Sequence, residues 1–180
     1  MFTTPLLLIV PTLSFRALGA LGVSRFATWR VSFAHGLAVM LVSTGIAHFI
    51  PDSIEAMPSH DDLAAMVPEL VPFPAATVYL TGVLELLGAA GLVVTRTRRY
   101  AGLGLAALFV LMFPANVHAA VADIPLNGDP ATPLWFRIPE QIVFVAVALW
   151  VSGVSGVWER VRPTPLGRTE VGAGPVPGRR

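Results

Sequence analysis

The sequence predicts an all-α membrane protein, and three observations carry this prediction. Hydrophobic residues make up 54% of the 180 residues, and the mean hydropathy of +0.71 is high for a water-soluble domain. Charged residues account for only 13% of the chain. Five apolar stretches of about 20 residues recur along the sequence, and a helix of that length spans the hydrocarbon core of a bilayer.

The first two stretches are expected to form helices over residues 5–23 and 31–50. Pro11 lies inside the first helix and is expected to bend it, because proline removes one backbone hydrogen bond. A cleaved secretory signal would begin with a basic segment, which the first stretch lacks. We therefore expect this stretch to be retained as a spanning helix.

The loop at residues 51–74 is rich in proline and acidic residues. Within it, residues 61–67 are expected to form a short amphipathic helix on the membrane surface. Either Ser59 or Asp61 could cap this helix, because both side chains carry an oxygen that accepts a hydrogen bond from a free backbone N–H group.

The third stretch, residues 75–95, carries Glu85 near its middle. A carboxylate at that depth is costly in hydrocarbon, so it should face protein. Gly82 and Ala89 lie on the same face of the expected helix as Glu85. Small residues allow another helix to pack closely, and we expect such a helix to cover the carboxylate.

The last two stretches are expected to form helices over residues 100–122 and 135–154, joined by a turn at residues 127–130. The chain beyond them is rich in proline, glycine and arginine and is too polar to bury a core. The expected organisation is therefore an N-terminal helix and link over residues 1–30, a transmembrane bundle over residues 31–155, and a disordered tail over residues 156–180.

Charged residues alternate between the two sides of this arrangement. The links at residues 24–30 and 96–99 and the C-terminal tail carry arginines, whereas the loops on the other side carry acidic residues and no basic ones. Basic residues mark the cytoplasmic side of membrane proteins. We therefore expect a multi-pass plasma-membrane protein with its N-terminus outside and its C-terminus in the cytoplasm.

Polar residues within the spanning stretches are the candidate site residues. Counted at 1.5 Å per residue, they lie near the midplane or in the outer half of the bilayer, and they are His48, Glu85, Asn116, Arg137 and Gln141. We expect them to form a polar cluster or ligand-binding site that opens outward, in which Glu85 bonds to Gln141 or Asn116. Each also has a structural interpretation: the carboxylate and the amides as hydrogen-bonding groups between helices, Arg137 as a headgroup anchor, and His48 as a wetted edge residue.

The sequence lacks the residues and motifs that several classes of protein function require. The chain has no cysteine, which excludes thiol chemistry. No phosphate-binding loop or nucleophile elbow occurs, and the arginines flank the membrane rather than form a nucleic-acid stripe. A metal site built from His48, Glu85 and His118 lacks a ligand spacing such as His-x-x-x-His. We therefore expect no catalytic residue, no metal site and no nucleic-acid partner.

Six short segments carry a family resemblance, and they occupy residues 45–49 (Gly-Ile-Ala-His-Phe), 66–68, 79–88 (Tyr-Leu-Thr-Gly-Val-Leu-Glu-Leu-Leu-Gly), 98–102, 113–117 and 134–141. In this order and spacing the chain resembles the DoxX-like family of small bacterial integral membrane proteins. The resemblance implies a four-helix transmembrane bundle with the five candidate residues at recurrent polar positions. The helix at residues 5–23 would be an addition to that bundle, and Glu140 stands where the family is usually apolar.

The resemblance also bears on function, because named relatives are linked to quinone-coupled sulfur oxidation and to oxidative-stress membrane complexes. The expected function is a non-catalytic or accessory membrane subunit, whose partners are the lipid bilayer and another membrane or redox protein. One alternative is a quinone-linked membrane oxidoreductase subunit, with quinone as its cofactor. Another is a small proton-linked carrier, against which the lack of two matching halves with broken helices argues.

Overall fold

The computed structural model describes residues 3–54 and 57–154, and within these residues the chain is helical without a strand. The helices are α1 (Thr3–Ala20), the 3-10 helix η1 (Ser24–Phe26), α2 (Trp29–Ala47), α3 (His60–Ala65), α4 (Pro74–Val93), α5 (Arg98–Val121) and α6 (Leu134–Ser152). The all-α prediction is confirmed for this part of the chain. The tail expected over residues 156–180 lies outside it.

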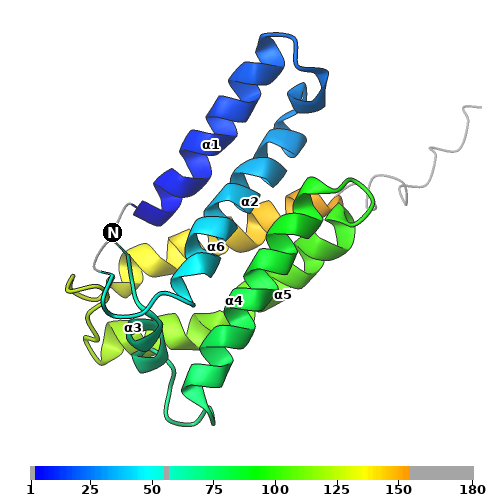
Figure 1. Cartoon of the computed structure of the whole chain (residues 1–180). Helices are drawn as coiled ribbons and strands as arrows, with labels where there is room; N and C mark the ends of the chain where they lie inside the picture. Colours follow the sequence, from blue (N-terminus) through cyan, green and yellow to red (C-terminus); the bar gives the residue numbers. More distant parts are fainter. Residues whose placement is uncertain (1–2, 55–56, 155–180) are drawn as a thin grey trace, which may run out of the picture.

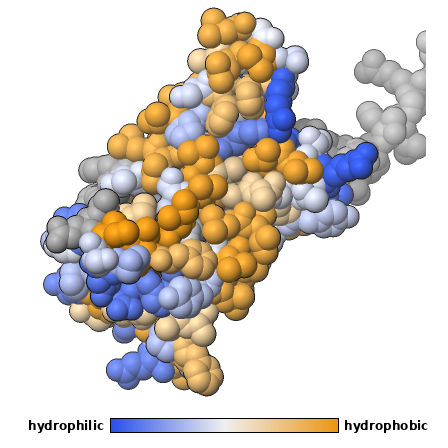
Figure 2. All heavy atoms as spheres, viewed as in Figure 1, coloured by the Kyte–Doolittle hydropathy of each residue, from blue (hydrophilic) through white to orange (hydrophobic). Residues whose placement is uncertain are grey.

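Five of these helices are long and apolar enough to cross a membrane: α1, α2, α4, α5 and α6. They correspond to the five stretches that the sequence predicted, with ends shifted by one to three residues. Large apolar side chains cover their outer surfaces, and Leu87, Leu111 and Ile142 are each more than 60% exposed. Figure 2 shows this surface as a hydrophobic band between hydrophilic residues at the two ends. The chain is a multi-pass helical membrane protein.

Helix α2 occupies the centre of the bundle. It packs against α1 on one side and α4 on the other and also contacts α6, while α5 packs against both α4 and α6. The shared core includes Leu37 and Leu41 of α2, Leu105 of α5 and Val151 of α6, all buried. Figure 1 shows α1 at the edge of the molecule, beside α2 and away from α4 and α5.

Arginines gather at one end of the bundle, which we call the arginine end. Arg25, in η1, donates to the carbonyl oxygen of Val93 at the end of α4, and Arg30, in α2, donates to that of Val151 near the end of α6. The predicted arginine-bearing links at residues 24–30 and 96–99 therefore lie together.

The acidic loops lie at the opposite end, with the short helix α3. Ser59 caps α3: its Oγ accepts from the backbone N–H of Asp62 at 3.1 Å, and Asp62 Oδ2 accepts from the backbone N–H of Ser59 at 3.0 Å. The alternative cap, Asp61, is wrong, because it lies inside the helix. The turn predicted at residues 127–130 forms one residue earlier, at residues 126–129, since Asp129 and Leu126 exchange backbone hydrogen bonds.

Candidate functional site

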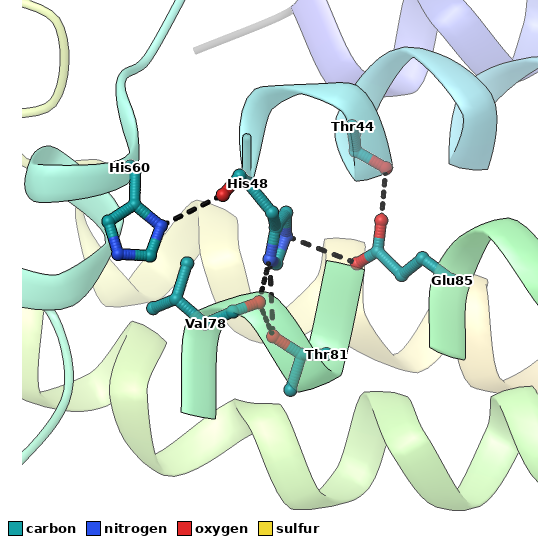
Figure 3. A network of polar contacts seen from close by, with 6 residues as sticks. All are labelled: Thr44, His48, His60, Val78, Thr81 and Glu85. Atoms are coloured by element: carbon teal, nitrogen blue, oxygen red, sulfur yellow. Dashed lines mark hydrogen bonds and ion pairs between the residues drawn. The ribbon is translucent and has the colours of Figure 1, made fainter. Parts of the chain in front are cut away.

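Two of the five candidate residues meet in the structure. His48 follows the last residue of α2, Glu85 lies on α4, and the imidazole Nε2 is 3.8 Å from the carboxylate Oε1 (Figure 3). Only 5% of His48 and 4% of Glu85 is exposed. The expectation that protein covers Glu85 is confirmed, whereas the interpretation of His48 as a wetted edge residue is wrong.

Two glycines allow α2 and α4 to approach at this point. A Cβ atom added at Gly82 would lie 2.5 Å from the Cβ of His48, and one added at Gly45 would lie 3.4 Å from the Cβ of Glu85. Gly82, Glu85 and Ala89 are all buried on one face of α4, as the sequence predicted. The helix that covers this face is α2.

Glu85 takes its hydrogen bond from Thr44, one turn before His48 on α2. Thr44 Oγ1 donates to Glu85 Oε2 at 2.7 Å (Figure 3). The prediction that Gln141 or Asn116 would be the partner is wrong, because those residues lie on α6 and α5 and the face of α4 that carries Glu85 packs on α2.

The hydrogen bonds of His48 fix the position of its ring proton. Its Nδ1 lies 2.8 Å from the carbonyl oxygen of Val78 and 3.2 Å from Thr81 Oγ1, which itself donates to Val78 at 2.9 Å. A carbonyl oxygen only accepts, so Nδ1 carries a hydrogen. In the neutral ring Nε2 then presents a lone pair to Glu85. A lone pair and an ionised carboxylate repel each other. The His48–Glu85 pair is therefore most stable with one proton in addition to that on Nδ1, carried either by Nε2 or by the Glu85 carboxylate.

Helix α3 is fixed beside this pair by two other histidines. His60 donates from Nδ1 to the carbonyl oxygen of His48 at 2.8 Å and stacks on Tyr79 at a centroid distance of 3.9 Å. His118 of α5 donates from Nδ1 to the carbonyl oxygen of Met66, which follows α3, at 3.0 Å. The loop between α2 and α4 thus covers the pair from the acidic end.

The other three candidate residues lie apart from this pair. Arg137 forms an ion pair of 2.9 Å with Glu140 one turn along α6, and Gln141 donates to the carbonyl oxygen of Phe109 on α5. Asn116 is half-buried, and its side chain makes no hydrogen bond to another described residue. Within residues 3–54 and 57–154, no hydrogen bond or ion pair joins these three residues to His48 or Glu85.

Three partners of the candidate residues were not predicted from the sequence: Thr44, Thr81 and Glu140. Thr44 stands four residues before His48, and Thr81 stands four residues before Glu85, so each pair shares one helix face. Arg137 and Glu140 are opposite charges at a spacing of three residues, which helices bring into contact. The signal in each case was helical spacing between polar residues.

A quinone would need hydrogen-bond donors for its carbonyl oxygens, and the donors beside the His48–Glu85 pair are already engaged. His48 Nδ1 is bonded to Val78, Thr44 Oγ1 to Glu85, and Thr81 Oγ1 to Val78. The described residues therefore do not fit a quinone at this place. Nor do they include a group of three or more histidine or acidic side chains placed to hold a metal ion.

A family model places this chain among known sequences. It is described as a domain of unknown function, DUF8561, and it matches residues 37–152, which include all five candidate residues. No curated protein and no solved structure matches the chain. Because the matched region covers more than half of the sequence and runs from α2 to the end of α6, the chain belongs to the DUF8561 family.

Proposed function

We propose that this protein is an accessory, non-catalytic subunit of a bacterial plasma-membrane complex, with a DoxX-like bundle that docks a membrane or redox partner. The observation that carries the proposal is that three of the candidate side chains in the bundle bind other side chains or the backbone. Glu85 is bonded to Thr44, His48 to Val78, and Gln141 to Phe109. Polar groups arranged in this way hold helices together.

The DoxX-like assignment gains support from the packing of two of the resembling segments. Residues 45–49 and 79–88 contain His48 and Glu85, together with the two glycines that allow these side chains to meet. The contact between His48 and Glu85 depends on residues of both segments. This dependence would explain why the two segments occur in the same sequence.

The proposed orientation has the arginine end in the cytoplasm and the N-terminus outside. Arg25, Arg30 and Arg98 lie at one end of the bundle, and basic residues favour the cytoplasmic side. The acidic loops then face outward, which leaves α3 and the loop around it accessible to an external partner.

A proton-linked function is the second candidate, and the His48–Glu85 pair favours it. A buried acid and a buried base that share one proton can take up or release it when their surroundings change. The quinone-linked alternative has less support, because the donors near the pair are engaged.

Mild-detergent purification and complementation together distinguish the two candidates. We expect the tagged wild-type protein and Glu85→Gln to co-purify the same membrane protein in near-equal amounts, and both to complement a deletion strain. The amide of glutamine retains the hydrogen bonding but not the acid. A Glu85→Gln protein that folds and keeps its partner but fails to complement would contradict the accessory role and favour the proton-linked one.

A further inference from the structure

Three arginines converge at the arginine end without an acidic partner. Arg25 Nη2 and Arg98 Nη2 lie 3.1 and 3.5 Å from the same atom, the carbonyl oxygen of Val93. Arg30 donates from Nε and Nη2 to the carbonyl oxygen of Val151 at 3.1 and 3.0 Å. Within the described part of the chain, no carboxylate forms an ion pair with any of the three.

The positive charge of this group is only partly compensated. The charges of Arg30 and Arg25 both act on Arg98, so the three guanidinium groups repel one another. The carbonyl groups at a helix C-terminus supply the equivalent of about half a negative charge per helix. The C-termini of α4 and α6 therefore offset only about one of the three positive charges. A ligand that matches this surface would be an anion.

An apolar groove leads to the same place. A cavity of about 380 Å³ lies between α1 and α4 with α2 as its floor, and Phe15, Val42, Leu86, Ala90 and Val93 are among its lining residues. Figure 1 shows α1 separated from α4 by α2. The groove reaches Val93, the residue whose carbonyl oxygen holds Arg25 and Arg98.

His35 connects the groove with the arginines. Its ring lines the groove, and the charges of Arg25 and Arg98 act on it. Its Nδ1 donates to the carbonyl oxygen of Val31 at 2.8 Å, and its Nε2 is buried without a hydrogen-bond partner. The groove wall therefore holds a polar atom on the side of the basic group, although this atom accepts hydrogen bonds and does not itself bind a phosphate.

We propose that this surface binds an anionic phospholipid. The phosphate lies on Arg25 and Arg30, which are exposed, with the buried Arg98 behind them, and one acyl chain lies in the groove between α1 and α4. A phosphate with an apolar chain matches a basic group that continues into an apolar groove, and basic pockets between transmembrane helices bind such headgroups. The inference does not depend on the proposed function or on which side of the membrane the arginine end faces.

Lipid binding to the delipidated full-length protein tests the charged part of the site. Native mass spectrometry would count bound lipids during titration with phosphatidylglycerol or phosphatidylcholine. We expect the wild-type protein to bind phosphatidylglycerol more tightly than phosphatidylcholine. The affinity for phosphatidylglycerol should fall by about fivefold for each arginine removed, in Arg25→Gln, in Arg30→Gln and in the double variant. The matched control is the double variant Arg96→Gln and Arg99→Gln, which removes the same charge from two exposed arginines of the neighbouring turn. Equal binding of both lipids, or equal loss in the control, would overturn the proposal.

A second variant tests the groove without changing charge. Ala90→Phe places a ring in the groove from an exposed position, whereas Leu87→Phe changes the same helix outside the groove. We expect the first to displace phosphatidylglycerol and the second to leave its binding unchanged. If inorganic phosphate competes with the lipid and Ala90→Phe leaves lipid binding unchanged, the surface binds an anion but no acyl chain. That result would refute the proposed phospholipid site.

Discussion

His48 and Glu85 stabilise the bundle as a pair rather than singly. An ion buried without a partner costs several kcal/mol even after the protein relaxes. Each group here also has partners outside the pair: Thr44 for the carboxylate, and the Val78 carbonyl and the Thr81 hydroxyl for the imidazole. Substituting either residue leaves the other buried without its partner in the pair. Single substitutions should therefore lower the free energy of unfolding by more than the pair itself contributes to it.

Substitution of Glu85 separates hydrogen bonding from charge. Glu85→Leu leaves Thr44 without its acceptor and His48 facing a methyl group, which should reduce stability by about 1–3 kcal/mol. Glu85→Gln keeps an acceptor for Thr44 and should lose much less. Thermal unfolding in detergent would measure both. A Glu85→Leu protein as stable as the wild type would show that the buried pair contributes nothing.

Thr44 provides a test on the other helix. Thr44→Val keeps the shape of the side chain but removes the donor to Glu85, and we expect a loss of about 1–3 kcal/mol. Ser43→Ala is the matched control, because the Ser43 hydroxyl donates only to Val39 within its own helix. If both variants unfold at the same temperature, the bond between Thr44 and Glu85 is not a stabilising one.

At the scale of helices, glycine positions decide how closely α2 and α4 approach. Gly82→Ala would place a methyl group against His48, and such overpacking costs about 1–3 kcal/mol. Gly104→Ala on α5 meets no atom within 4 Å and should stabilise its helix by about 0.5–1 kcal/mol. Unfolding temperatures that move in opposite directions would support this account, and a Gly82→Ala protein of unchanged stability would contradict it.

The spanning helices could be predicted from the sequence because their signal is local. A run of apolar residues with the length of a bilayer is visible without knowledge of its neighbours, and each predicted stretch became a helix. Pairing between helices is not local. The pattern of α4 indicated that Glu85 needs a cover, but nothing in that pattern specifies α2 rather than α5 or α6.

The candidate site was predicted in part for the same reason. His48 and Glu85 were identified as polar residues in apolar surroundings, and they do meet. Their distance from Arg137 and Gln141 follows from the packing of α6 on α5. The burial of His48 follows from the position of α3, which His60 and His118 fix through contacts between residues distant in sequence.

At the scale of the molecule, the family match begins at Leu37 and leaves α1 outside. Helix α1 packs on α2 and η1, and its buried residues are Leu8 and Thr12. The matched region thus holds α2 from Leu37 onward together with α4, α5 and α6, and α1 adds one wall of the groove at the arginine end. The division into an N-terminal helix and a bundle stays a prediction.

Charge distribution gives the whole molecule two distinct ends, and this makes its orientation testable. Arginines lie at the end formed by η1, the turn between α4 and α5, and the C-terminus of α6. Asp61 in α3 lies at the other end, together with Asn127 and Asp129 in the loop between α5 and α6. Because the chain contains no cysteine, a single introduced cysteine can be labelled without background.

Labelling of single cysteines in intact cells is the most direct test of the five-span arrangement. The variants are Asp61→Cys and Asn127→Cys at the acidic end and Thr95→Cys at the arginine end, all at exposed positions that keep every arginine. We expect a membrane-impermeant maleimide to label the first two in intact cells and Thr95→Cys only after permeabilisation. Labelling of Thr95→Cys in intact cells, or of only one of the first two, would contradict the arrangement.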